Sequence, residues 1–141
     1  MKSRFAVTLG SLLLTAAAAF AQINTVRAEI TVAIPFAFRA GDTMLPAGQY
    51  EIRSEAGKNV LLIRCPERNA SILVPTSDTR YAQPQERGRL MFHQYGENYF
   101  LAEAWAPGTS HGRTLQESEP ERELARNSAR PKPVTIALAA K

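Results

Sequence analysis

A strict alternation of apolar and polar residues opens the part of the chain that can build a core. Between Glu29 and Phe38, every second residue is large and apolar: Ile30, Val32, Ile34, Phe36 and Phe38. Successive side chains of a β-strand point to opposite faces, so a period of two predicts a strand with one buried face. Pro35 lacks the N–H that a ladder needs, which predicts an edge strand or a bulge there.

Five further segments are typical of strands and are separated by turn-forming residues. They cover residues 50–54, 60–65, 70–76, 88–95 and 99–106. Residues 77–87 are polar, contain Pro84, and are expected to form a loop. Several short strands with turns between them are typical of all-β folds. We therefore predict a mostly β fold: a single antiparallel β-sandwich or small β-barrel of about six to seven strands, with a short C-terminal helix.

The C-terminal part predicts that helix. Ser118 and Glu121 have the spacing of a capping box, and Pro120 suits an early helical position. We expect a helix over about 120–129, followed by either a terminal strand or a loose tail, because alternation resumes at Val134. The predicted organisation is a β domain at 22–116 and a charged helix with a C-terminal tail or strand at 117–141.

The N-terminus has the three parts of a secretory signal peptide. Lys2 and Arg4 precede an uncharged stretch from Phe5 to Phe20, and small residues flank a cleavage position after Ala21. The stretch is shorter than the roughly 20 apolar residues of a spanning helix. We predict a signal peptide at 1–21 and a periplasmic or extracellular protein without an integral membrane span after cleavage; a cut after Ala28 is the alternative.

Charge and cysteine content narrow the possible functions. Cleavage after Ala21 removes two of the 17 basic residues and none of the 13 acidic ones, so the net charge falls from +4 to +2 over the remaining 120 residues. This weak charge gives no case for a nucleic-acid partner. Cys65 is the single cysteine, so it cannot form an internal disulfide, and we expect it to be a small buried residue.

His93 and Glu103 are the most plausible reactive pair. They lie on the two strands of one predicted hairpin, where a histidine and a carboxylate can act as base and orienter. The alternative is an ordinary cross-strand polar pair, because loop length decides whether they share a face. His111 is expected on a surface loop. No nucleophile, metal-ligand spacing or cofactor motif accompanies them, so we assign no catalytic residue, no metal site and no cofactor.

The same hairpin concentrates aromatic residues. Tyr95, Tyr99 and Trp105, together with His93 and Glu103, form the speculative binding set. Aromatic side chains on an exposed sheet face can stack on sugar rings or anchor a protein partner. The alternative is cross-strand packing in the core.

Two motifs resemble a group of small exported β proteins found in soil bacteria. The first runs from Ile34-Pro35-Phe36 through Gly41-Asp42 to Leu45-Pro46-Ala47-Gly48-x-Tyr50, and the second from Phe92-His93 to Glu103-x-Trp105. The resemblance implies a shared β fold and export over residues 30–125. It transfers no activity, cofactor or catalytic residue.

The sequence therefore favours an exported, non-enzymatic β-sheet binding or interaction protein of the cell envelope. Its partner is expected to be an unknown envelope protein or a glycan; a bound apolar molecule or another protein's strand is also compatible with a β scaffold. Two alternatives stay open: a small envelope hydrolase that uses His93 and Glu103, and a structural component of an envelope assembly.

Overall fold

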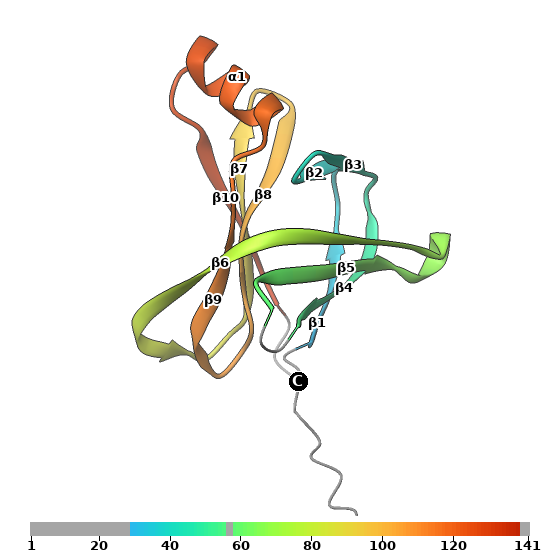
Figure 1. Cartoon of the computed structure of the whole chain (residues 1–141), viewed down its shortest axis with the longest axis vertical. Coiled ribbons are helices and arrows are strands. Elements are labelled where there is room, and N and C mark those ends of the chain that lie inside the picture. The colour runs from blue at the N-terminus through green and yellow to red at the C-terminus, as the bar shows by residue number, and fades with distance from the viewer. Residues whose placement is uncertain (1–28, 56–57, 139–141) are drawn as a thin grey trace, which may run out of the picture.

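The computed structural model describes residues 29–55 and 58–138, most of which lie in β-strands (Figure 1). The predicted signal peptide and its cleavage at Ala21 lie outside the described residues. The strands are β1 (Glu29–Ile34), β2 (Phe38–Ala40), β3 (Thr43–Leu45), β4 (Gly48–Ser54), β5 (Val60–Cys65), β6 (Ala70–Gln85), β7 (Arg89–Tyr95), β8 (Asn98–Trp105), β9 (Thr109–Leu115) and β10 (Lys132–Ala137). A 3-10 turn at Pro66–Arg68 and the helix α1 (Glu119–Asn127) complete the described elements.

The strands form one antiparallel sheet that nearly closes into a barrel. Neighbours follow the order β1, β4, β5, β6, β9, β8, β7 and β10, and no pairing between described residues joins β10 back to β1. The short hairpin of β2 and β3 lies beside β8, where β2 makes the sheet's one parallel pairing among the described strands. The mostly β prediction is confirmed, but the predicted six to seven strands are too few.

Three of the ten described strands were missed. Pro35 ends β1, so the predicted first strand splits into β1 and β2, and a tight turn at Gly41 (φ +59°) leads into β3. The third missed strand is β9, in a segment without apolar alternation. The predicted loop over 77–87 is also wrong, because β6 continues to Gln85. Its pairing with β9 shifts register between Arg80 and Gln85, around Pro84.

The core fills the space between the inward faces of the sheet. β1 alternates between exposed and buried residues, as predicted, with Ile30, Val32 and Ile34 inside. Phe38 meets both Tyr50 and Phe92 edge to face, with ring centroids 5.2 and 5.5 Å apart. Cys65 is buried and free, as expected. Full burial of a large apolar side chain such as Phe38 contributes about 1.5–3 kcal/mol, so the residues of this core supply much of the stability of the fold.

The two ends of the barrel differ. Figure 1 shows α1 at one end, beside the β7–β8 turn; we call this the helix end. The predicted cap is confirmed: Ser118 is the N-cap and its hydroxyl accepts from the N–H of Glu121, although the helix begins one residue before the predicted start. The opposite end contains the start of β1, the β6–β7 connection and the β8–β9 turn, and we call it the pocket end.

Candidate functional site: a cavity at the pocket end

A cavity of about 330 Å³ lies between the two halves of the sheet at the pocket end. Its apolar walls come from β1, β4, β5 and β8 and comprise Ile30, Ile52, Leu61 and Ala104, all of which are buried. Its more polar rim comprises Ser54, Asp78, Ala106, Thr109, His111, Gly112 and Arg113. Small-molecule sites have this combination of size, apolar walls and a few polar groups.

The register between β6 and β9 creates the change from apolar wall to polar rim. Opposite residues of an antiparallel pair share a face, so each pair adds one layer to the wall. From the core outward, three layers on this face are Thr76 with Leu115, Asp78 with Arg113, and Arg80 with His111. The first layer is buried, whereas Asp78, Arg80 and His111 are exposed. The side chains thus become more polar as the sheet approaches solvent.

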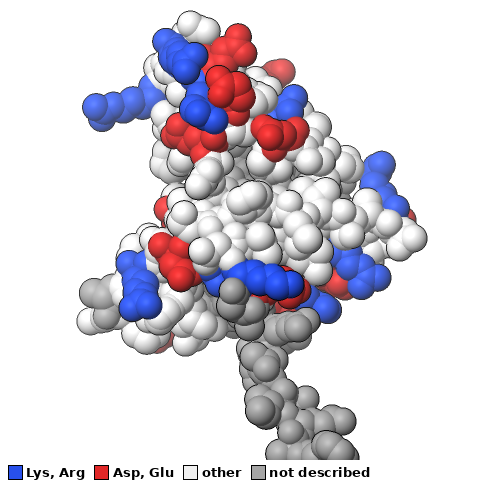
Figure 2. All heavy atoms as spheres, in the orientation of Figure 1, with Lys and Arg blue, Asp and Glu red and all other residues white. Residues whose placement is uncertain are grey.

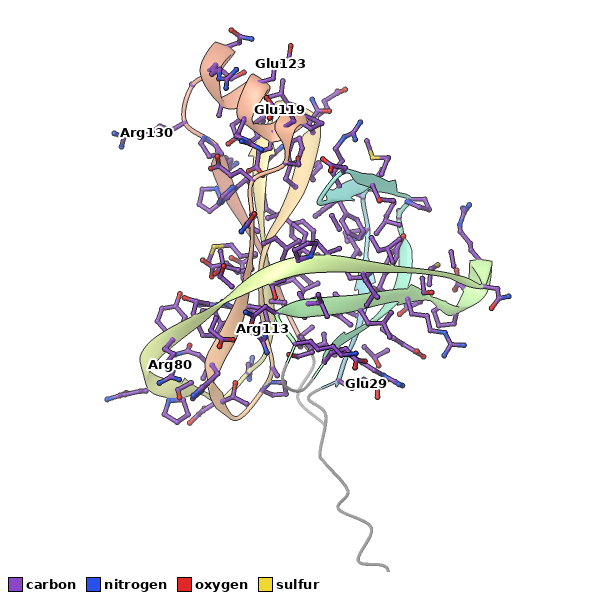
Figure 3. All side chains as sticks on the ribbon, in the orientation of Figure 1. Glu29, Arg80, Arg113, Glu119, Glu123 and Arg130 are labelled. Carbon is purple, nitrogen blue, oxygen red and sulfur yellow. The ribbon has the colours of Figure 1, made fainter. Side chains whose placement is uncertain are left out.

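Arg113 is held firmly at the rim. Its Nε donates to the hydroxyl of Ser54 at 3.0 Å, and its Nη1 donates to the Asn59 amide oxygen at 3.4 Å and to the Asp78 carboxylate. The Arg113 side chain is 17% exposed, while that of Asp78 is 62% exposed. In Figure 3, Arg113 lies near the crossing of β6 and β9, and Arg80 lies farther toward the outer end of that strand pair. The less exposed member of this ion pair is therefore the cation.

Trp105 supports the wall of the cavity from the outer face of the sheet. It is 1% exposed, and its ring covers Gly112, where an added Cβ would lie 2.5–2.7 Å from ring atoms. The Tyr81 ring stacks on it at 4.2 Å, and the Arg89 guanidinium lies 5.7 Å from its ring centroid. The indole N–H donates to the Glu103 carboxylate at 2.8 Å. Trp105 is thus a packing residue.

The other predicted aromatic residues also pack inside the protein. Tyr95 is 6% exposed and meets Phe100 edge to face at 5.8 Å. Tyr99 is half-buried, stacks on Phe36 at 3.9 Å, and accepts a hydrogen bond from the Gln94 amide at 3.1 Å. These contacts are the packing alternative that the sequence left open, so an exposed aromatic platform does not form at the hairpin.

His93 and Glu103 share the outer face of the β7–β8 hairpin but have different partners. Glu103 accepts from Trp105, whereas Nδ1 of His93 lies 2.7 Å from the carboxylate of Glu121 on α1. The hydrogen bond to Glu121 raises the pKa of His93, burial opposes this effect, and the charges of Glu121, Glu117 and Glu103 add to the rise. In a catalytic dyad His93 and Glu103 would contact each other, but here each contacts another residue. The hydrolase alternative therefore stays a prediction without geometric support.

Sequence reasoning missed the rim of the cavity. Asp78 lies in the predicted loop, and Arg113 and His111 lie in a segment also expected to be a loop, yet β6 and β9 bring all three together. The sequence signal that could have revealed the rim is the opposite charge of Asp78 and Arg113, which lie 35 residues apart. Sequence separation hides such a pair until the strand register is known.

Comparisons with known proteins give no family for this chain. No protein-family model, no curated protein and no solved structure matches it. The resemblance drawn from the two sequence motifs therefore stays a prediction. Within residues 29–55 and 58–138, no helix is long and apolar enough to cross a membrane, and no group of three or more His, Cys, Asp or Glu side chains is placed to hold a metal ion.

Proposed function

We propose that this chain is an exported, non-enzymatic binding protein of the cell envelope and that the cavity at the pocket end holds its ligand. The observation that carries the proposal is the cavity itself, whose walls consist of four buried aliphatic residues and whose rim has a few polar groups. The signal-peptide pattern supports export.

The walls favour a small molecule with an apolar body over a glycan. Sugar recognition on a sheet uses exposed aromatic rings, and Tyr95 and Trp105 are buried here. Ile30, Ile52 and Leu61 instead offer aliphatic surface, which gains free energy in proportion to the apolar area that a ligand removes from water.

Titration of residues 22–141 with N-phenyl-1-naphthylamine, a neutral apolar fluorophore, tests this proposal. We expect saturable fluorescence enhancement. Ala106 is half-buried at the rim, so Ala106→Phe should obstruct the cavity and weaken binding by about tenfold or more. Ala125 is exposed on α1, and Ala125→Phe should bind as the unchanged protein does.

Circular dichroism must show that both variants fold. Absence of saturable binding by the unchanged protein would contradict the proposal. So would equal binding by folded Ala106→Phe and the unchanged protein.

A further inference from the structure

We infer that the ligand is an amphipathic anion: a medium-length apolar chain that enters the cavity, with a carboxylate headgroup that pairs with Arg113 at the rim. The inference rests on the proposed function and names the chemical class of the ligand. Three observations lead to it: the fixed position and low exposure of the rim cation, the exposure of its present counter-ion, and the size of the cavity.

The first observation is the fixed position of the guanidinium. Arg113 is 17% exposed and donates to Ser54, on β4, and to Asn59, just before β5, as well as to Asp78. These contacts orient the guanidinium before any ligand arrives. Guanidinium groups bind carboxylates through two parallel hydrogen bonds, so a preorganised arginine favours a carboxylate strongly.

The second observation is that the counter-ion can be exchanged. Asp78 is 62% exposed, and exposed ion pairs contribute only about 0–1 kcal/mol. The Asp78 carboxylate can therefore turn into solvent, and a ligand carboxylate that takes its place keeps the Arg113 charge paired. Asp78 is the only acidic residue among the described lining residues, while Arg80 and His111 extend the same face outward. A cationic headgroup would have to displace Arg113, which is the better-held partner.

The third observation is the size of the cavity. Its volume of about 330 Å³ equals that of about eleven water molecules, at roughly 30 Å³ each. This space suits an apolar body of about ten to twelve non-hydrogen atoms, such as a decyl chain or the naphthyl group of the fluorophore, with the rest of the ligand at the rim; it excludes a complete phospholipid. Decanoate has the right size and chemistry, and decan-1-ol and decylamine are its matched neutral and cationic analogues.

Displacement of N-phenyl-1-naphthylamine by these three compounds tests the inference. For the unchanged protein we expect decanoate to bind at least about tenfold more tightly than decan-1-ol, with decylamine weakest. Arg113→Gln should abolish the preference for decanoate, judged as the ratio of the decanoate and decan-1-ol affinities measured within that variant. Arg113→Lys keeps the charge but loses the paired hydrogen bonds, so it should retain part of the preference. Asp78→Asn removes the competing anion and should strengthen decanoate binding.

Arg64→Gln is the matched control, because Arg64 is a half-exposed arginine on β5 that pairs with Glu51 and does not line the cavity. It should leave all three affinities unchanged. If the fluorophore binds but the unchanged protein holds decanoate and decan-1-ol equally, the inference is wrong and the proposed binding function stands. If the fluorophore itself does not bind, both are wrong.

Discussion

The helix end and the pocket end can be compared through one partly buried ion pair at each, His93–Glu121 and Arg113–Asp78, in which the less exposed partner is the anion at one end and the cation at the other. At the helix end the anion is buried: the Glu121 side chain is 5% exposed and that of His93 is 32% exposed. At the pocket end the cation is the less exposed partner: the Arg113 side chain is 17% exposed and that of Asp78 is 62% exposed. Figure 2 shows charged side chains gathered toward both ends of the visible face, with a largely uncharged belt between them.

This reversal separates a structural contact from an exchangeable one. A fully buried charge that loses its partner costs several kcal/mol, and this applies to Glu121, whereas Arg113 keeps some contact with water and also donates to Ser54 and Asn59. Glu121 is the single buried residue of α1, and its partner His93 belongs to the same chain. Arg113 pairs with Asp78, an exposed carboxylate that water can hydrate if the pair separates. The helix end is therefore closed by its own residues, while the pocket end can accept an anion from outside.

The largest predicted effect concerns the wall of the pocket end. Trp105→Ala removes a fully buried indole and should lower the free energy of unfolding by about 3–5 kcal/mol. Urea denaturation followed by circular dichroism measures this. Tyr81→Ala, at a 39% exposed residue stacked on the same ring, should cost less.

Gly112 provides the control for this interpretation. Gly112→Ala places a methyl group within 2.7 Å of the indole and should cost about 1–3 kcal/mol in the native background. In the Trp105→Ala background, that cost should largely disappear, because the clashing ring is gone. Equal costs in the two backgrounds would show that the indole does not pack against Gly112.

The sequence predicts well the elements whose signals are local. The alternation in β1 is confirmed because its inner side chains face the core and its outer ones face water. The N-cap at Ser118 is confirmed because capping depends only on residues within one turn. The terminal segment pairs with β7 as β10, which was one of two open alternatives.

The candidate site was not predictable in the same way. In β9 only Gly112 and Leu115 are buried, so the strand shows no period of two, and its pairing with β6 is what holds it in the sheet. The cavity rim depends on that pairing. The partner of His93 was likewise missed, because Glu121 comes from a helix 28 residues away whose docking the sequence does not reveal.

A pH-dependent prediction tests the helix end. The pKa of His93 is raised in the folded protein, so its pair with Glu121 stabilises the fold fully below the unfolded pKa of about 6.5. That contribution is lost as the pH rises through the higher folded pKa. At pH 6, Glu121→Gln should cost about 1–3 kcal/mol, and at pH 8.5 it should cost less.

Urea denaturation at the two pH values measures these costs, and NMR titration of His93, assigned with His93→Gln, checks the direction of the pKa shift. A cost for Glu121→Gln that grows with pH would contradict the assignment of His93 as the cationic partner. A His93 pKa below the ordinary value would contradict it independently.

The smallest predicted effect is at the pocket end and completes the comparison. Asp78→Asn should lower the free energy of unfolding by less than about 1 kcal/mol, because solvent and salt screen an exposed carboxylate. Glu29→Gln is a control, since Glu29 is an exposed carboxylate that pairs with Arg53 and does not line the cavity. The two variants should have equal stabilities, while only Asp78→Asn should change decanoate affinity. A loss above about 2 kcal/mol for Asp78→Asn but not for Glu29→Gln would show that Asp78 fixes the rim as firmly as Glu121 fixes α1. A ligand carboxylate could then not replace Asp78 at Arg113.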